Sequence, residues 1–366
     1  MKITCFIDDL NPGGAQRQIC YLAKILKEQG HDVAILTYNT NNFFIQEIKK
    51  HNIKYFSITH KIKIINFYKI IKFIRSYNHD VVIAYLRNPV LLAEIASIRR
   101  KNWKLIVSER NAYINNDFFK LFIRRVFHLL ADHIVVNSNT NKELLNKNAP
   151  WLRDVTTIYN YVDLDFFKPI NKNKFLQKIV LLGVGKYSYQ KNINNLIEAI
   201  KIIKDNNFSI DIKLNWFGDT LVAESKNKLI QELKYKIKRY KLESNINLYP
   251  ATKDVINQYR VSSALILPSF YEGLPNVACE AMSVGLPLLL SNVCDNKNLV
   301  ENNKNGFLFN PSEPQDIANK IIDFANLQNA KRIQMGSYSR KKSLTMFNKI
   351  KFIDMYSKII NSKNKK

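Results

Sequence analysis

Short continuous runs of apolar residues alternate along this chain with segments in which apolar residues recur every three or four positions. Continuous runs are typical of strands covered on both faces, and the longer spacing is typical of amphipathic helices. In the first half, the runs predicted to be strands are Lys2–Ile7, Val33–Thr37, Ile53–Ile58, Val81–Tyr85, Leu105–Ser108, Ile134–Asn137 and Val155–Ile158. They indicate a doubly wound α/β domain over residues 1–165.

The same alternation restarts after a polar, irregular segment at 160–177. The predicted strands of the second half are Lys178–Gly183, Ile210–Trp216, Ile246–Tyr249, Ala264–Leu267 and Leu286–Leu290. They indicate a second Rossmann-like domain over residues 175–330. Residues 331–366 are basic and carry apolar residues at helical spacing, so we expect a helix that returns to the first domain. The predicted fold class is α/β, with two Rossmann-like domains facing each other across a cleft.

Composition agrees with two domains and adds a strong basic bias. The chain has 366 residues, of which 46% are hydrophobic, and its net charge is +26. Such an excess is compatible with nucleic acid, anionic lipid head groups or phosphorylated substrates as partners, or with a biased genome composition. The sequence contains no pattern of a nucleic-acid-binding module, so we expect no nucleic-acid partner.

The cysteines and the apolar stretches bear on where the protein acts. The four cysteines show no CxxC spacing, which predicts buried, reduced thiols and a cytosolic protein. The chain enters its first predicted strand directly, so we expect no signal peptide. Its uncharged apolar stretches are too short to span a bilayer.

One stretch, Leu267–Ser291, brings two acids close together in sequence. It has the sequence LPSFYEGLPNVACEAMSVGLPLLLS, which predicts a strand end, a loop, a helix that begins near Pro275, and another strand. Glu272 lies in the loop and Glu280 lies eight positions later on the helix. Side chains on a helix lean towards its N-terminus, so Glu280 is expected to point back towards the loop that carries Glu272.

This arrangement suits a ligand that has both a phosphate and sugar hydroxyls. The free amides at a helix start hold phosphate or hydroxyl oxygens, and carboxylates accept hydrogen bonds from pairs of hydroxyls. A nucleotide sugar has both groups. The alternative is that Glu272 and Glu280 are ordinary solvated surface acids.

The run PSFYEGLPNVACEAMSVGLP resembles the E-x7-E motif of retaining GT-B glycosyltransferases of the family 4 type. The resemblance implies a hexosyltransferase-type enzyme whose second domain binds a nucleotide-sugar donor. Glu272, Gly273, Leu274 and Asn276 would then face the sugar, and Glu280 the ribose. The first domain would bind the acceptor, which in this family is often lipid-linked. The expected setting is assembly of surface polysaccharide or lipopolysaccharide.

Two glycine loops precede predicted helices, where a phosphate can approach the backbone. The first contains Gly13-Gly14, and the second contains Gly183-Val184-Gly185-Lys186 followed by Lys191-Asn192. The chain has no G-x-G-x-x-G sequence, which argues against a nicotinamide dinucleotide. By resemblance, Gly14, Gly185, Lys186 and Lys191 belong near the donor diphosphate. Lys186 stands where the family usually has Arg, and Asn192 where it usually has Gly.

The two lysines are the strongest candidates to stabilise a departing diphosphate. At about 4 Å and an effective dielectric near 20, each contact contributes roughly 4 kcal/mol before desolvation. A helix dipole contributes only roughly 0.3–1 kcal/mol. We therefore predict that Glu272, Lys186 and Lys191 carry the catalytic role. The alternative for the lysines is two solvated surface side chains.

The segment Ser108-Glu109-Arg110-Asn111 follows a predicted strand of the first domain and should line the cleft. Arg110 is a candidate for binding a phosphate, and Glu109 for binding an acceptor hydroxyl. Many family members have a histidine near here, and this chain does not. None of its six histidines lies in a motif, and His128 and His133 are interpreted as structural.

Asp163-Leu164-Asp165 looks like the DxD metal motif of other transferases. It follows Asn160-Tyr161-Val162, which resembles the family's hinge between the domains except that Tyr161 replaces Gly. We therefore interpret it as a structural linker. Because no His, Cys and carboxylate cluster has metal-ligand spacing, we expect no essential metal and no cofactor beyond the donor substrate.

Two segments, Phe118–Leu130 and His60–Tyr77, combine large apolar residues with basic ones. Basic amphipathic helices can lie in a membrane interface, which would place the protein peripherally at the inner face of the plasma membrane. The alternative is a pair of helices docked on the sheet with their basic groups outward.

Two functional hypotheses follow. In the first, the chain is a retaining glycosyltransferase, in which the acceptor attacks the face from which the nucleotide leaves and a phosphate oxygen takes the acceptor's proton. In the second, it is a non-catalytic basic binder of membranes or nucleic acid on a decayed GT-B core. The departures at Lys186, Asn192 and Tyr161 favour the second hypothesis, and the intact pair Glu272 and Glu280 favours the first. A GT-B epimerase or phosphorylase is a third, minor alternative.

Overall fold

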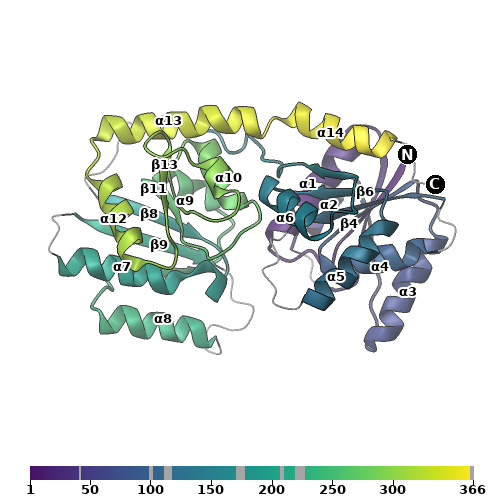
Figure 1. Ribbon diagram of the computed structural model, residues 1–366, viewed down its shortest axis with the longest axis horizontal. Coiled ribbons are helices and arrows are strands. Elements are labelled where there is room, and N and C mark those ends of the chain that lie inside the picture. Colours follow the sequence, from purple (N-terminus) through teal and green to yellow (C-terminus); the bar gives the residue numbers. More distant parts are fainter. Residues whose placement is uncertain are drawn as a thin grey trace. The chain divides into compact units, whose positions relative to one another are not determined.

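The chain forms two compact units, which a computed structural model describes over residues 1–40, 43–98, 102–110, 118–169, 178–206, 210–218 and 227–362. Unit 1 comprises Met1–Tyr161 and Lys349–Lys366, and unit 2 comprises Val162–Asn348. Each unit contains one parallel β-sheet with helices on both faces (Figure 1).

The sheet of unit 1 has the strand order β3-β2-β1-β4-β5-β6-β7, and all its pairs are parallel. The strands are β1 (Lys2–Phe6), β2 (Asp32–Thr37), β3 (Lys54–Ser57), β4 (Val81–Tyr85), β5 (Lys104–Glu109), β6 (His133–Val136) and β7 (Val155–Thr157). Every strand predicted in this half is present, with ends shifted by one residue or less. Continuous apolar runs were a sufficient signal because both faces of the sheet are buried.

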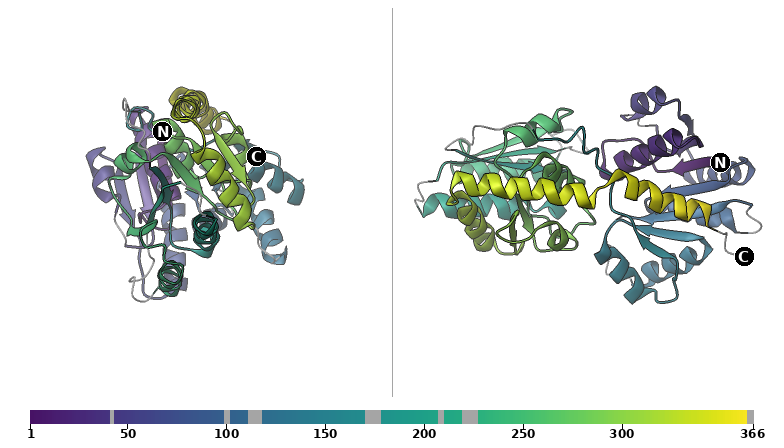
Figure 2. Two further views of the ribbon diagram at one scale, coloured as in Figure 1. Left: turned by 90° about the vertical axis from the view of Figure 1, so that its left-hand side faces the viewer. Right: turned by 90° about the horizontal axis from the view of Figure 1, so that it is seen from above.

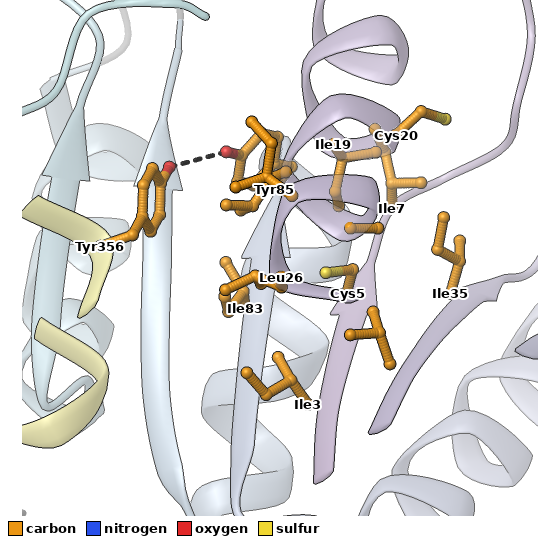
Figure 3. Close-up of a cluster of buried hydrophobic side chains, with 14 of the residues drawn as sticks. Ile3, Cys5, Ile7, Ile19, Cys20, Leu26, Ile35, Ile83, Tyr85 and Tyr356 are labelled. Carbon is orange, nitrogen blue, oxygen red and sulfur yellow. Dashed lines mark hydrogen bonds between the residues drawn. The ribbon is translucent and has the colours of Figure 1, made fainter. Parts of the chain in front are cut away.

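Helices cover both faces of this sheet, so alternate strand residues enter different cores. Ile3, Cys5 and Ile7 face a core formed with α1 (Gly14–Glu28), α2 (Ile45–Lys50) and α14 (Lys349–Asn361) (Figure 3). Phe6 faces the opposite core, formed with α3 (Lys63–Ser76), α4 (Arg87–Ser97) and α6 (Asn139–Asn148). The helix α5 (Phe118–Phe127) and the 3-10 turn η1 (His128–Leu130) follow β5 and contact α4.

The sheet of unit 2 has the strand order β10-β9-β8-β11-β12-β13 and is also parallel. Its strands are β8 (Ile179–Val184), β9 (Ile212–Gly218), β10 (Ile246–Pro250), β11 (Ala264–Leu267), β12 (Leu288–Ser291) and β13 (Gly306–Phe309). The predicted strands did not include β13, a four-residue run that follows an asparagine-rich turn. Its pairing with β12 brings the Gly306 backbone so close that a Cβ there would lie 1.9 Å from the Leu288 carbonyl oxygen.

The helices of unit 2 also divide between the two faces of its sheet. They are α7 (Ile193–Asp205), α8 (Lys228–Arg239), α9 (Val255–Val261), α10 (Asn276–Val284), α11 (Asn296–Leu299), α12 (Pro314–Ala325) and α13 (Asn329–Met346), with a 3-10 turn η2 (Tyr189–Lys191) before α7. Helix α7 packs against α8 and α12, while α10 packs against α9 and α13 (Figure 1).

The C-terminal tail differs from the single helix expected over 331–366. It forms two helices, α13 and α14, that are interrupted at Phe347 and Asn348 (Figure 2). Helix α13 belongs to unit 2, and only α14 belongs to unit 1. A continuous basic, apolar pattern could not show this break, because residues on both sides of it recur at helical spacing.

Both sheets have the strand order of a Rossmann fold, in which the direction of strand addition reverses once. The reversal lies between β1 and β4 in unit 1 and between β8 and β11 in unit 2. Ligands of such sheets bind beyond the carboxyl ends of the strands at this reversal. A ligand of unit 2 is therefore expected at the loops that follow β8 and β11.

Candidate functional site

An ion pair connects the loops that follow β8 and β11. Lys191 Nζ lies 2.5 Å from Glu272 Oε1, and the two side chains are only 15% and 9% exposed. The sequence predicted both residues as site residues, but it did not predict that they touch. The pair lies at the strand-order reversal of unit 2, where a ligand is expected.

Further hydrogen bonds hold the same two loops together. The Phe270 amide donates to the Gln190 carbonyl at 2.9 Å, and Gln190 Nε2 donates to the Tyr271 carbonyl at 2.8 Å. The amide group of Asn192 donates to the Pro268 carbonyl at 3.0 Å, and also to the Pro311 carbonyl, in the loop after β13, at 2.7 Å. The positions of Lys191 and Glu272 are thus fixed by the protein itself, which lowers the cost of ordering them around a ligand.

Asn192 adopts a backbone conformation that explains a departure from the family pattern. Its φ and ψ are 53° and 39°, in the left-handed region that glycine visits freely and asparagine visits more readily than most residues. Asparagine can therefore take the place of the usual Gly without a change of turn. Its buried side chain also supplies the two hydrogen bonds to the loop carbonyls that glycine would lack.

Gly185 lies close to two neighbours. A Cβ at Gly185 would lie 2.9 Å from Lys191 Cε, and a Cβ at Gly218 would lie 2.2 Å from the Gly185 carbonyl oxygen. That carbonyl also accepts a hydrogen bond from Trp216 Nε1 at 3.0 Å. Lys186 follows on the same loop with an exposed side chain. The roles of Gly185 and Lys186 at a diphosphate remain predictions.

Helix α10 carries the second acid of the motif. Glu280 is 4% exposed and accepts a hydrogen bond from the Tyr259 hydroxyl at 2.9 Å, while Glu272 is 8% exposed. The alternative interpretation of both as solvated surface acids is therefore wrong. The helix begins at Asn276, so Pro275 is its N-cap rather than a first-turn residue.

The remaining predicted donor residues lie between these two acids. Gly273 and the buried Leu274 belong to the loop after β11, and Asn276 is the first residue of α10. The chain leaves α10 at Gly285, whose φ of 81° suits glycine.

Sequence reasoning missed two residues of this site. Tyr259 on α9 is fully buried and donates to Glu280, but a single tyrosine in a short helix carries no recognisable signal. Cys294 follows β12, with φ of 48°, and its thiol accepts a hydrogen bond from the Glu272 backbone amide. Burial raises the pKa of this thiol above its usual value, and the nearby Glu272 carboxylate acts in the same direction.

In unit 1, the predicted acceptor residue Glu109 belongs to a buried ionic cluster. Its Oε1 lies 2.5 Å from Arg124 Nη2 and 3.0 Å from His128 Nε2, and His128 Nδ1 lies 2.5 Å from Glu94 Oε1. Burial alone would raise the pKa of Glu109, but Arg124 and His128 hold it at about 2. Burial alone would lower the pKa of His128, but its two carboxylate partners raise it to about 9. The interpretation of His128 as structural agrees with this packing.

Two neighbours hold the guanidinium of Arg110. Its guanidinium donates to Asn160 Oδ1 and stacks on the Tyr85 ring, with its Cζ 4.6 Å from the ring centroid. The Tyr85 hydroxyl in turn bonds the Tyr356 hydroxyl of α14 at 2.8 Å (Figure 3). Asn111, the last residue of this predicted motif, lies outside the described residues. The acceptor roles of Glu109 and Arg110 remain predictions.

The two other predicted loops have simple local structures. Gly14 is the exposed first residue of α1. Asp163 Oδ1 accepts hydrogen bonds from the amides of Asp165, at 3.2 Å, and Phe166, at 3.0 Å, so this DxD sequence forms a turn. Within the described ranges, no three His, Cys, Asp or Glu side chains are grouped as metal ligands.

The fold and the site define a class of protein, and comparisons with known families identify it. Residues 12–166 match the model described as Glycosyltransferase Family 4, and residues 166–342 match the model described as Glycosyl transferases group 1. These consecutive matches span both units. The chain belongs to the glycosyltransferases of this group and has the GT-B fold.

Individual relatives agree with this assignment. The chain is 27% identical to an uncharacterized glycosyltransferase of Haemophilus influenzae, over 93% of this chain and 95% of that protein. It is 26% identical, over 91% of both chains, to a Campylobacter jejuni α-1,4-N-acetyl-D-galactosaminyltransferase whose name specifies a diphosphoundecaprenol-linked glycan. The crystal structure of Anabaena HepE in complex with UDP superposes with a TM-score of 0.83, at 19% identity, over 99% of this chain and 100% of that one.

The hydropathy of the helices can also be checked in the structure. Within the described ranges, none of them combines the length and the apolar character needed to cross a bilayer.

Proposed function

We propose that this glycosyltransferase is a retaining enzyme. It would move a sugar from a nucleotide-sugar donor to a lipid-linked or glycan acceptor in surface polysaccharide assembly. The observation that carries the proposal is the Lys191–Glu272 ion pair at the strand-order reversal of unit 2. The name of the Campylobacter jejuni relative supports a lipid-linked acceptor, and the Anabaena complex with UDP supports a nucleotide ligand. The protein would then work peripherally at the inner face of the plasma membrane.

The Lys191–Glu272 ion pair can contact both the diphosphate and the sugar of a nucleotide sugar. The Lys191 ammonium has three donors, so it can keep its contact with Glu272 and also donate to a diphosphate oxygen. Only Oε1 of Glu272 has a hydrogen-bond partner among the described residues, which leaves Oε2 for a sugar hydroxyl. Glu280, oriented by Tyr259, would accept from the ribose hydroxyls. The backbone amides from Gly273 to Asn276 would complete the sugar site.

In the proposed reaction, the nucleotide diphosphate is the leaving group, and its developing negative charge must be stabilised. The acceptor oxygen forms a bond to the anomeric carbon while the bond from that carbon to the diphosphate oxygen breaks. The acceptor's proton passes to a phosphate oxygen of the departing nucleotide, and attack on the same face retains the anomeric configuration. Lys186, Lys191 and the Gly185 loop would balance the negative charge of the leaving group, and we propose that no resident metal is required.

The acceptor is assigned to unit 1. Arg110 would bind an acceptor phosphate through its guanidinium, and Glu109 an acceptor hydroxyl. Because Glu109 Oε1 already accepts from Arg124 and His128, only its second oxygen remains for this role.

Substitution of the ion pair tests the proposal. We expect Lys191→Ala and Glu272→Gln each to lower sugar transfer by roughly 100-fold or more, because each removes charge or a hydrogen bond used in the transition state. Glu280→Ala should weaken nucleotide binding instead. The measurements are transfer activity over a panel of nucleotide sugars, with NMR of the product's anomeric configuration, and thermal shift with free nucleotides.

A matched control is Lys320→Ala, which breaks the exposed Lys320–Asp323 pair in the same unit and should change nothing. Full activity in both Lys191→Ala and Glu272→Gln would overturn the site assignment. An inverted product would overturn the retaining mechanism. Absence of any nucleotide-dependent thermal shift would favour the non-catalytic alternative.

A further inference from the structure

A small cavity lies between α7, α8 and the loop that follows β11. Its volume is about 170 Å³, and its apolar lining consists of Ile193 on α7 with Leu229 and Leu233 on α8. These residues lie near the starts of the two helices, which pack against each other and follow the carboxyl ends of β8 and β9 (Figure 1). The cavity therefore lies at the edge of the sheet where ligands of this fold bind.

The cavity is separate from the predicted donor site, although the two share a pair of loops. Tyr189 of η2 and Phe270 after β11 line the cavity, whereas Lys191 and Glu272 do not. The Phe270 amide donates to the Gln190 carbonyl at 2.9 Å, which connects these two loops. Each loop thus contributes one residue to the cavity and another to the Lys191–Glu272 ion pair.

The polar groups at the cavity are amides and a hydroxyl, contributed by Ser188, Asn194 and Asn195. Asn194 Oδ1 accepts a hydrogen bond from Lys236 Nζ at 3.4 Å, and Asn195 Nδ2 donates to the Pro311 carbonyl at 2.9 Å. The NH₂ group of Asn194 and the Oδ1 atom of Asn195 have no hydrogen-bond partner among the described residues. The lining can therefore both donate to and accept from the hydroxyl groups of a ligand.

No charged side chain lines the cavity in the part of the chain that the structure describes. Two charged residues contact the lining, and their charges are opposite. Glu232 Oε2 accepts from the Tyr189 hydroxyl at 3.3 Å, and Lys236 donates to Asn194. The chain has 56 lysines and arginines, yet none of the described ones lines this space. The lining therefore disfavours a phosphate, a carboxylate or a nucleotide diphosphate, which proteins bind through basic side chains.

The size of the cavity and its aromatic residues restrict the ligand further. Its volume equals that of roughly six water molecules, at about 30 Å³ each in the liquid. Sites that enclose a drug-sized ligand typically measure roughly 300–1,000 Å³. Tyr189 is 66% exposed and Phe270 is 40% exposed, so the cavity opens to solvent beside them. Their rings are available to pack against apolar C–H groups of a ligand.

We propose that this cavity binds one neutral sugar unit of a glycan. A sugar ring is small and uncharged, and it carries both hydroxyl groups and apolar C–H groups. Its hydroxyls bond with Asn194 and Asn195, and its C–H groups pack against Tyr189 and Phe270. Linked sugar units extend through the open side of the cavity. The identity of the glycan as acceptor or product rests on the proposed function, but sugar binding itself requires no catalysis.

Saturation-transfer NMR with the full-length protein tests this proposal. The neutral probes are glucose, galactose, mannose, N-acetylglucosamine, N-acetylgalactosamine, maltotriose and N-acetylchitotriose. The charged comparisons are glucuronic acid and glucose 6-phosphate. We expect signals from neutral monosaccharides and from a trisaccharide, in which they are concentrated on one ring. The charged sugars should bind more weakly by roughly tenfold or more, because the cavity offers them no cation.

Two variants alter the cavity in different ways. Tyr189→Ala removes an aromatic contact, and Leu229→Trp fills the space. Each should weaken sugar binding by roughly tenfold or more, because aromatic contacts dominate the energetics of such sites and a filled cavity has no room for the ring.

Tyr235→Ala is the matched control. Tyr235 lies on α8 and is 68% exposed, which is close to the exposure of Tyr189, but it does not line the cavity. This variant should bind sugars as the parent does. Circular dichroism melting shows that each variant is folded.

Four outcomes would overturn the proposal. The first is the absence of a signal from every neutral sugar with the parent protein. The second is equal binding of the charged sugars. The third is binding of monosaccharides without either trisaccharide, which would make the ligand a free sugar. The fourth is a signal that is lost in Glu272→Gln and kept in Tyr189→Ala, which would place the sugars in the donor site.

Nucleotide thermal shift in the cavity variants reports on the donor site separately. It should equal that of the parent, because neither Tyr189 nor Leu229 belongs to the predicted donor residues. Loss of sugar binding with an intact nucleotide response in these variants supports the cavity as a second site. Failure of this proposal is thereby distinguishable from failure of the proposed function.

Discussion

Asn192 shows how one residue can satisfy two requirements of the donor loop. Its left-handed backbone permits the turn before α7, and its side chain holds the carbonyls of Pro268 and Pro311. The sequence alone presented this asparagine as a departure from the family pattern. The structure shows that Asn192 keeps the turn that glycine would form and adds two hydrogen bonds.

Asn192→Gly should therefore destabilise the protein although glycine suits the backbone. We expect a loss of roughly 2 kcal/mol in the free energy of unfolding, because the buried Pro268 carbonyl loses its side-chain donor and the Pro311 carbonyl keeps only the bond from Asn195. Urea denaturation followed by circular dichroism measures it. The control is Asn303→Gly, at an exposed asparagine with φ of 64°, which should be close to neutral. Equal stability of Asn192→Gly and the parent would show that the side-chain bonds contribute nothing.

The ionic cluster around His128 should give unit 1 a defined pH dependence. His128 has a pKa of about 9, above its ordinary 6.5, so its stabilisation is complete below pH 6.5 and is lost as the pH rises towards 9. Glu109 has a pKa of about 2, below its ordinary 4.5, so its stabilisation is complete above pH 4.5 and is lost as the pH falls towards 2. Each contribution is roughly 3 kcal/mol.

We accordingly expect the free energy of unfolding to be highest between about pH 4.5 and 6.5, the ordinary values of the two groups. His128→Gln should remove most of the decline on the alkaline side, as measured by urea unfolding at pH 6 and pH 9. The control His60→Gln, at a histidine outside the cluster, should keep the decline. A parent protein whose stability is flat between these two pH values would contradict the assigned cluster.

Among the elements, α5 and α14 show what periodicity can and cannot predict. The spacing of apolar residues predicted both segments as helical. It did not predict which face of α5 is buried, because Arg124 on that face pairs with Glu109, which lies on a different element. The outward face carries Phe119, Phe122 and Ile123, which are 40–69% exposed. Nor did it predict that the tail breaks before α14, which has its own partners in unit 1.

One of those partners is Lys104, at the start of β5. Its ammonium donates to the carbonyls of Ile359, at 3.0 Å, and Ile360, at 2.8 Å, and to both oxygens of Ser362. Three of these acceptors are carbonyls at the C-terminal end of α14, where the last carbonyls of a helix lack ordinary intrahelical partners. Lys104 therefore caps the helix from another element.

Lys104→Met should loosen α14 because it keeps the length of the side chain and removes the donor. We expect a loss of roughly 2–4 kcal/mol in the free energy of unfolding and faster proteolysis of the tail. Lys358→Met is the control, since Lys358 is exposed on α14 itself and should have little effect. If both variants resist protease as the parent does, the cap is not needed to hold α14.

For the whole molecule, the order of strands decides where chemistry is possible. Lys191 and Glu272 are 81 residues apart in sequence, yet the loops that carry them follow adjacent strands of one sheet. Their proximity brings Lys191 against Glu272. The sequence predicted both loops as site loops from their motifs, but the contact depends on which strands pair.

The sequence by itself determined the number and kind of most elements, the division into two α/β halves and the family motif around Glu272 and Glu280. These features are local, because a strand buried on both faces and a helix with one buried face each leave a periodic pattern in the chain. Only the tertiary structure decided that Lys191 meets Glu272, that Tyr259 holds Glu280, and that α5 turns its apolar face outward. Each of these depends on partners far away in sequence, which no local pattern encodes.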